Sequence, residues 1–299
     1  MSTSDRTCVR TFFSVTVCFL HLASSTSSST TVYPCASTTC VRTLTPYPAS
    51  TIAYWPFDGN SNDMDNIYTG VNSGCTYQSS SLIYWGGSAL YCTGTYSVSV
   101  PFAFMNLTYR SFTVEAWIRP ITSLGVELGI FGQCVSSSIT DQCLVLSIKT
   151  GRLHMSFGND DAWGGTLLSL NTWYYVAFVY DDVLLEKSIY LNGALDGASM
   201  GGPYAGMSGT VTIGSAASGS PFTGYIDQVI VSGWAKSACQ VLNDYSLVAY
   251  YPLDSGTTLQ DYSVSSYFVG STGATSLVTG RINQALLLSA ATSNFQVEQ

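Results

Sequence analysis

The residues best suited to do chemistry lie in two short acidic segments. Residues 58–65 read Asp-Gly-Asn-Ser-Asn-Asp-Met-Asp, and such side-chain oxygens are the ligands that calcium prefers. Asp58 and Asp65 are the expected metal ligands. The segment is not an EF-hand loop, because position 63 is Asp rather than Gly and position 69 is Thr rather than Glu. The alternative is an Asx-rich turn that hydrogen-bonds to its own backbone.

The second acidic segment, residues 159–165, reads Asn-Asp-Asp-Ala-Trp-Gly-Gly. Adjacent carboxylates at Asp160 and Asp161 repel each other unless solvent or a cation separates them, so calcium is again a candidate. The flat side chain of Trp163 offers a surface for a sugar ring. We therefore expect a ligand site at Asn159, Asp160, Asp161 and Trp163. In this interpretation the loop carries no core residue, so changing both aspartates to Asn leaves the fold intact; a solvated hairpin loop is the alternative.

Catalytic constellations are not evident. A glycosidase needs two carboxylates that flank the scissile bond, but no glutamate has another carboxylate at two-residue spacing on the same strand face: Glu115, Glu127, Glu186 and Glu298. His154 is expected to be a surface or edge residue, and no G-x-S-x-G elbow provides a nucleophilic serine. The sequence therefore predicts a protein that is not an enzyme.

Composition favours an all-β extracellular protein. Hydrophobic residues make up 46% of the chain and charged residues only 9%, far below the usual quarter. The net charge is −8, with only ten Lys and Arg residues, so neither nucleic acid nor an anionic membrane surface is an expected partner.

The N-terminal segments predict export. Residues 1–25 combine Arg6 and Arg10 with an apolar run and small residues, as in a signal peptide. Residues 26–50 continue a Ser/Thr-rich run that suits a stalk or linker. No other segment is long and apolar enough for a membrane span, so the fragment is expected to be secreted or on the cell surface.

Cysteine spacing predicts two disulfides in an exported chain. Cys134 and Cys143 flank a polar loop and would close a hairpin, and Cys75 and Cys92 would join two neighbouring strands. The partners of the other cysteines stay open: Cys35, Cys40 and Cys239. Asn106 begins an N-glycosylation sequon.

A long-range repeat predicts domain boundaries. Residues 52–58 (Ile-Ala-Tyr-Trp-Pro-Phe-Asp) return at 248–254 as Val-Ala-Tyr-Tyr-Pro-Leu-Asp, 196 positions later. This spacing suits a whole domain rather than a solenoid repeat. We expect one complete domain at 51–247 and the start of a second, incomplete copy at 248–299.

Periodicity predicts the elements of a sandwich. Residues 112–118 alternate between core and polar positions, whereas 173–180 are apolar on both faces and predict a central strand covered on both sides. Residues 192–193 (Asn-Gly) predict a tight turn. A short helix is expected at 238–245, with Ser237 as its cap.

Six sequence blocks, in this order, resemble the laminin G-like, concanavalin A-like lectin family: 53–58, 111–118, 171–181, 189–193, 211–214 and 222–229. The resemblance implies an antiparallel two-sheet jelly-roll sandwich, an extracellular location, and recognition of carbohydrate or protein, often with bound calcium. One departure is Tyr175, where relatives commonly have His.

These observations predict a secreted, non-enzymatic recognition or adhesion module that binds a glycan or an extracellular protein. Two other hypotheses stay open. One is an accessory binding domain of a larger carbohydrate-active enzyme, and the other is a structural spacer.

Overall fold

The structure is a computed structural model, and it describes residues 51–79, 87–134, 141–207, 209–216, 220–246, 269–273, 275–279, 284–289 and 293–298. The predicted signal peptide (1–25) and linker (26–50) lie outside the described residues. No described helix is both long and apolar enough to cross a membrane.

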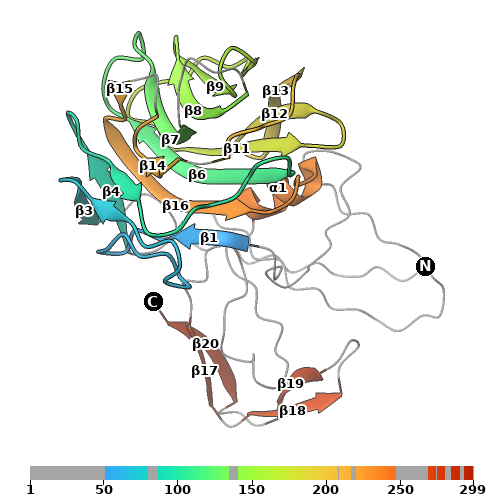
Figure 1. Cartoon of the computed structure of the whole chain (residues 1–299). Coiled ribbons are helices and arrows are strands. Elements are labelled where there is room, and N and C mark those ends of the chain that lie inside the picture. Colours follow the sequence, from blue (N-terminus) through green and yellow to red (C-terminus); the bar gives the residue numbers. More distant parts are fainter. Residues whose placement is uncertain are drawn as a thin grey trace. The chain divides into compact units, whose positions relative to one another are not determined.

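Two sheets of eight strands stack as a sandwich (Figure 1). In spatial order, sheet I contains β13 (Ala194–Met200), β12 (Glu186–Leu191), β11 (Tyr174–Asp181), β6 (Phe112–Pro120), β16 (Gly224–Ser232), β4 (Ser88–Cys92) and β3 (Thr76–Ser79), with β1 (Thr51–Trp55) also paired to β16. Sheet II contains β10 (Asp161–Trp163), β9 (Arg152–Ser156), β8 (Cys143–Lys149), β7 (Leu128–Cys134), β14 (Val211–Ile213), β5 (Val98–Val100) and β2 (Val71–Asn72), with β15 (Ser220–Pro221) beside β7. Apart from the parallel β15–β7 pair, these pairs are antiparallel, which confirms the predicted all-β jelly-roll sandwich.

The main core lies between the inner faces of the two sheets. Strand β11 explains why residues 173–180 are apolar throughout. Its Val176 and Phe178 belong to the main core, whereas Tyr175 and Ala177 belong to a second cluster on the other face of sheet I. The strand lies between β6 and β12, so the predicted central strand, covered on both sides, is confirmed.

Helix α1 (Ala238–Ser246) covers the outer face of sheet I. Ser237 caps the helix: its Oγ accepts from Gln240 N at 3.4 Å, and its own N donates to Gln240 Oε1 at 2.8 Å, a reciprocal capping box. The predicted Asn192-Gly193 turn joins β12 to β13 with φ of 50° and 78°, as a type I′ turn requires. A Cβ at Gly193 would come within 2.9 Å of Leu242 on α1, so the packed helix also requires glycine there.

Both predicted disulfides are confirmed. Cys75 bonds to Cys92 beside the β3–β4 pair, and Cys134 bonds to Cys143 across the β7–β8 pair. Cys239 on α1 is also disulfide-bonded, and its partner lies outside the described residues.

The C-terminal described strands form two pairs. Strand β17 (Val269–Gly273) pairs with β20 (Asn294–Glu298), and β18 (Thr275–Thr279) pairs with β19 (Gln284–Leu288). In this order the first strand pairs with the last, and the two middle strands pair with each other. The first domain has the same arrangement, because β2 pairs with β5 and β3 with β4. The incomplete second domain stays a prediction, and the repeated pairing supports it.

Candidate functional site

Residues 159–165 are not simply a loop, because 161–163 form the edge strand β10. Ala162 is fully buried in the main core. Its neighbours Asp161 and Trp163 therefore point to the outer face of sheet II, since successive side chains of a strand alternate. The expectation that this segment carries no core residue is wrong.

Asp160 has a structural partner. Its Oδ2 lies 2.7 Å from Nζ of Lys187, whose side chain is 0% exposed, and it also accepts a 2.8 Å hydrogen bond from Gly202 N. Removing one member of a buried ion pair leaves an uncompensated charge and is strongly destabilising. Contrary to the sequence-based expectation, we therefore expect Asp160→Asn to destabilise the fold.

The proposed calcium ligands Asp160 and Asp161 have separate partners. Asp160 binds Lys187, and Asp161 Oδ1 lies 3.4 Å from His154 Nε2. Lys187 thus compensates the charge of Asp160, whereas the Asp161 side chain is 36% exposed and open to solvent. Within the described residues, no group of three or more His, Cys, Asp or Glu side chains comes together as metal ligands.

The first acidic segment also bonds to the protein. Asp58 Oδ1 accepts from Ser88 N at 2.8 Å, and Asp63 Oδ1 accepts from Tyr68 N at 2.7 Å. Asp65 is exposed. Within the segment, Asn60 Oδ1 accepts from Asn62 N at 2.8 Å, as in the Asx-rich turn that was the alternative to a calcium site, whereas the Asp58 bond reaches β4, 30 positions away.

The outer face of sheet II carries a polar and aromatic surface over β8, β9 and β10. The inner residues of β8 and β9 are apolar core residues, so the alternate positions point outward. In the strand register, Trp163 lies opposite His154, and His154 lies opposite Ser147. We call this surface the Trp163 platform, and it comprises Ser147, Lys149, Arg152, His154, Asp161 and Trp163, with Glu127 beside them.

His154 lies beneath this platform and is only 2% exposed, so the expectation of a surface or edge residue is wrong. Its Nδ1 lies 3.1 Å from Ser147 Oγ and 3.5 Å from Glu127 Oε1. Burial lowers the pKa of His154, although Asp161 acts in the opposite direction. Its buried Nε2 makes no hydrogen bond with a described residue.

Trp163 is the exposed part of the platform. It is 41% exposed, its ring centroid lies 4.3 Å from that of His154, and Lys149 Nζ lies 5.7 Å from its ring centroid. The indole is thus supported from below and open to solvent, an arrangement that suits stacking of a flat apolar ligand face. Of the four predicted ligand-site residues, the platform includes Asp161 and Trp163. The exposed Asn159, with φ of 64°, precedes it in the chain, and Asp160 is paired with Lys187.

Sequence reasoning missed five residues of the platform: Glu127, Ser147, Lys149, Arg152 and His154. The signal that could have found them is the alternation of polar and apolar residues along 144–149 and 152–156. Reading that alternation requires knowing which strands are neighbours, because one strand alone places only two or three side chains on a face.

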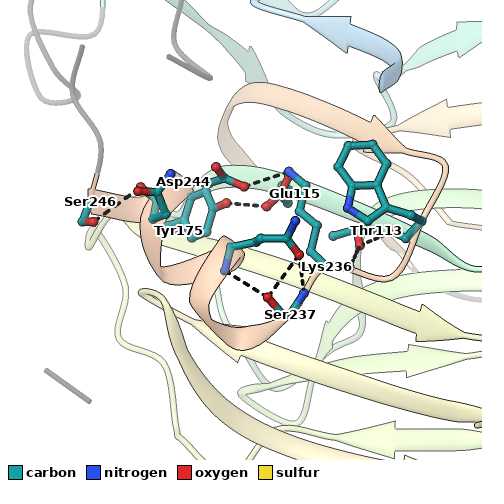
Figure 2. Close-up of polar contacts among 10 residues, drawn as sticks. Thr113, Glu115, Tyr175, Lys236, Ser237, Asp244 and Ser246 are labelled. Carbon is teal, nitrogen blue, oxygen red and sulfur yellow. Dashed lines mark hydrogen bonds and ion pairs between the residues drawn. The ribbon is translucent and has the colours of Figure 1, made fainter. Parts of the chain in front are cut away.

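A second polar cluster lies on the outer face of sheet I, beneath α1 (Figure 2). Lys236 Nζ donates to Glu115 Oε2 and to Asp244 Oδ2, the latter at 2.8 Å, and Tyr175 Oη donates to Glu115 Oε1 at 2.6 Å. We call these four residues the α1 cluster. Tyr175 thus ties β11 to Glu115 on β6.

The α1 cluster is closed to solvent. Its Glu115 and Lys236 are 1% and 7% exposed. Burial, then Glu115, raise the pKa of Asp244 to about 6. Burial by itself lowers the pKa of Lys236, but the two carboxylates raise it above its ordinary value. Because a ligand has no access, this cluster fixes the helix rather than forming a binding site.

The predicted glycosylation site is accessible. Asn106 is exposed, and its Oδ1 accepts from Thr108 N at 3.1 Å. Its occupancy stays a prediction.

The two packed, mainly antiparallel sheets define an all-β sandwich protein. A family model described as the concanavalin A-like lectin/glucanases superfamily (Laminin_G_3) matches residues 93–242. The chain belongs to this family. None of the curated proteins compared with the chain matches it in sequence.

Solved structures share the fold at low sequence identity. Domain 4 of AbnA, a GH43 extracellular arabinanase from Geobacillus stearothermophilus solved in complex with arabinotriose, is 16% identical with a TM-score of 0.52, covering 65% of this chain and 97% of that one. The binding domain of botulinum neurotoxin DC in complex with rat synaptotagmin II is 16% identical with a TM-score of 0.50, covering 71% of this chain and 55% of that one. This chain thus spans about half of the toxin domain. At these identities the likeness establishes the fold alone.

Proposed function

We propose that this protein is a secreted or cell-surface recognition module that binds glycans on the Trp163 platform. The observation that carries the proposal is a 41% exposed tryptophan, supported by His154, on the outer face of a sandwich sheet. Binding sites of this kind combine an apolar surface with a few polar groups that fix ligand orientation. Here Lys149 and Asp161 are polar groups beside the indole.

The proposed role is non-enzymatic. Ser147, His154 and Asp161 come together as members of a catalytic triad would, but the geometry does not suit a nucleophile. Ser147 is 0% exposed and its Oγ donates to Glu127 Oε1 at 2.9 Å. A substrate carbonyl could not reach that oxygen without unfolding part of sheet II.

Two observations support the extracellular location. The chain contains the disulfides Cys75–Cys92 and Cys134–Cys143, which persist in oxidising compartments. The sequence at 1–25 has the pattern of a signal peptide. A tandem arrangement of domains, with 248–299 as the start of a second copy, fits a multi-domain surface protein.

A second candidate function is an accessory binding domain of a larger carbohydrate-active enzyme. The arabinanase domain solved with arabinotriose favours this hypothesis because this chain covers 97% of it. Both hypotheses place glycan binding on this domain, and they differ only in what the rest of the protein does.

The test is a glycan array with the full chain and the Trp163→Ala variant. We expect binding by the unchanged protein and a loss of roughly tenfold or more on removal of the ring, taking stacking of a sugar face to be comparable to base stacking on an aromatic side chain, which contributes on the order of 1–3 kcal/mol. Tyr109→Ala is the matched control, because Tyr109 is an aromatic residue that is 58% exposed outside the platform. Equal binding by Trp163→Ala would contradict the assignment of the site, and no glycan binding at all would favour a structural spacer.

Calcium is not required in this proposal, because Lys187 compensates the charge of Asp160 and the Asp161 side chain is 36% exposed to solvent. We expect glycan binding to persist in excess chelator. Loss of binding that is restored by added calcium would contradict this expectation.

A further inference from the structure

The Trp163 platform holds two of the chain's ten basic residues directly opposite each other. Lys149 and Arg152 form a cross-strand pair at the end of the β8–β9 hairpin. Like charges in this position destabilise a hairpin. Such a pair is notable in a chain whose net charge is −8.

The two cations are not equally compensated. Lys149 Nζ lies 3.6 Å from Glu127 Oε2. Arg152 has no ion pair or side-chain hydrogen bond with any residue in the described part of the chain. By contrast, the buried Lys187 and Lys236 both bind carboxylates. A partly exposed guanidinium without a partner is free to bind a carboxylate or sulfate group, which its fork of N–H donors matches.

The platform also has a defined order of chemical groups. Along β9, the outward positions are Arg152, His154 and Ser156, about 7 Å apart because each residue of a strand advances about 3.4 Å. Trp163 lies beside His154, and Asp161 lies beside Ser156. The sequence of groups is therefore a cation, an aromatic ring and a carboxylate. That spacing is comparable to the size of one sugar ring.

The buried His154 Nε2 provides an independent observation. This nitrogen has no hydrogen-bond partner among the described residues, although Asp161 Oδ1 lies 3.4 Å away. A buried polar atom without a partner costs about 1–3 kcal/mol. A buried polar atom of this kind calls for an explanation, and this one belongs to the residue whose ring centroid lies 4.3 Å from that of the exposed Trp163.

Resting on the proposed glycan-binding role, we propose that the Trp163 platform selects anionic sugars that carry a carboxylate or sulfate group. Arg152, supported by Lys149, binds the anionic group. The sugar ring stacks on Trp163, and the 36% exposed Asp161 side chain accepts hydrogen bonds from ring hydroxyls. Glu127, 3.6 Å from Lys149 Nζ, holds this lysine in place.

The test uses pairs of probes that differ only in charge. Calorimetric titration of the full chain compares an oligogalacturonide with its methyl ester, and a sulfated oligosaccharide with its desulfated form. We expect at least one charged form to bind about tenfold or more tightly than its neutral partner, as a charge-assisted bidentate pair allows. Which charged form binds identifies the anion that the site takes.

Substitutions assign the selectivity to Arg152. The Arg152→Gln variant should bind charged and neutral forms almost equally, with little change for the neutral form. Arg110→Gln is the matched control, because Arg110 is an exposed cation between β5 and β6 rather than on the platform; it should keep the preference. Trp163→Ala should weaken binding of both forms.

Different failures separate the two proposals. Equal binding of charged and neutral forms that still depends on Trp163 would overturn anionic selectivity and leave glycan binding intact. An unchanged preference in Arg152→Gln would likewise overturn the role of this residue. No binding of any probe would overturn both proposals.

Discussion

The outer faces of the two sheets carry similar chemical groups and use them differently. The α1 cluster and the Trp163 platform each combine a lysine, two carboxylates and an aromatic residue. On sheet I the helix covers the charges, and Lys236 is bonded to both Glu115 and Asp244. On sheet II no described helix covers the face, and Lys149 and Trp163 stay partly exposed.

The comparison shows that burial beneath a helix, rather than the residue types, decides whether a charged cluster stabilises the fold or stays accessible to a ligand. Beneath α1 the effective dielectric constant is low, so each charge needs a partner and the network fixes the helix on the sheet. On the platform, solvent screens the charges, and a weak surface ion pair can exchange for a ligand. The predictions below test this comparison with matched substitutions in the two clusters.

The largest effect is expected from Lys236→Met. This change leaves Glu115 and Asp244 buried without their cation, and breaking such a network costs about 3–5 kcal/mol. The same change at Lys149, whose side chain is 38% exposed, should cost less than about 1 kcal/mol. Urea unfolding of both variants measures the difference, and similar losses would show that the cover does not matter.

A smaller contrast is expected between two tryptophans. Trp117 is half-buried, and its ring centroid lies 5.5 Å from that of Tyr175 and 5.9 Å from that of Tyr245 on α1. Trp117→Ala should destabilise the fold by roughly 3 kcal/mol through the cavity it creates. Trp163→Ala should cost about 1 kcal/mol and affect mainly ligand binding. Thermal unfolding together with glycan binding distinguishes the two, and an equal loss of stability would contradict the prediction.

The smallest effects concern pH dependence. The contributions of Asp244 in the α1 cluster and His154 in the Trp163 platform to the free energy of unfolding should change with pH in opposite directions. The folded-state pKa of Asp244 is raised to about 6 from 3.8, so the folded state holds more protons and this contribution to stability falls as pH rises from about 4 to 6. The pKa of His154 is lowered from 6.5, so its contribution is lost as pH falls below about 6.5.

Variants isolate these two contributions. For Asp244, we compare the free energy of unfolding of the unchanged protein with that of the Asp244→Asn variant. The difference, unchanged protein minus variant, should fall by roughly 1–3 kcal/mol between pH 4 and 7. The corresponding difference for His154→Gln should rise between pH 5 and 7. Denaturant unfolding at several pH values measures both, and slopes of the same sign would be incompatible with the comparison.

Strand pairing at the start of the domain was predictable because it depends on local sequence. Tyr77 pairs with Leu90 in the first domain, and Leu277 pairs with Leu286 in the C-terminal segment. The match between Ala89-Leu90 and Ala285-Leu286 is visible in the sequence. The β3–β4 pair is also joined by the Cys75–Cys92 disulfide. At the corresponding positions of the β18–β19 pair, Thr275 lies opposite Leu288.

The candidate site was only partly predictable. Trp163 and Asp161 were found because an acidic segment beside an aromatic residue is visible along the chain. The ion pair of Asp160 could not be foreseen, because its partner Lys187 is 27 positions away and belongs to sheet I. His154 was assigned wrongly because its neighbours come from two other strands, β8 and β10, and from the segment before β7.

The sequence by itself determined the sandwich fold, the central strand β11, both described disulfides and the capped helix, because periodicity, cysteine spacing and capping residues act within short stretches of chain. Only the tertiary structure decided which charges are structural and which are accessible. That distinction depends on what lies across the sheet and above it: α1 covers Glu115, whereas Arg152 and Trp163 lie on an open face. Burial, and hence the strength of an ion pair, is a property of the folded surroundings rather than of the residue.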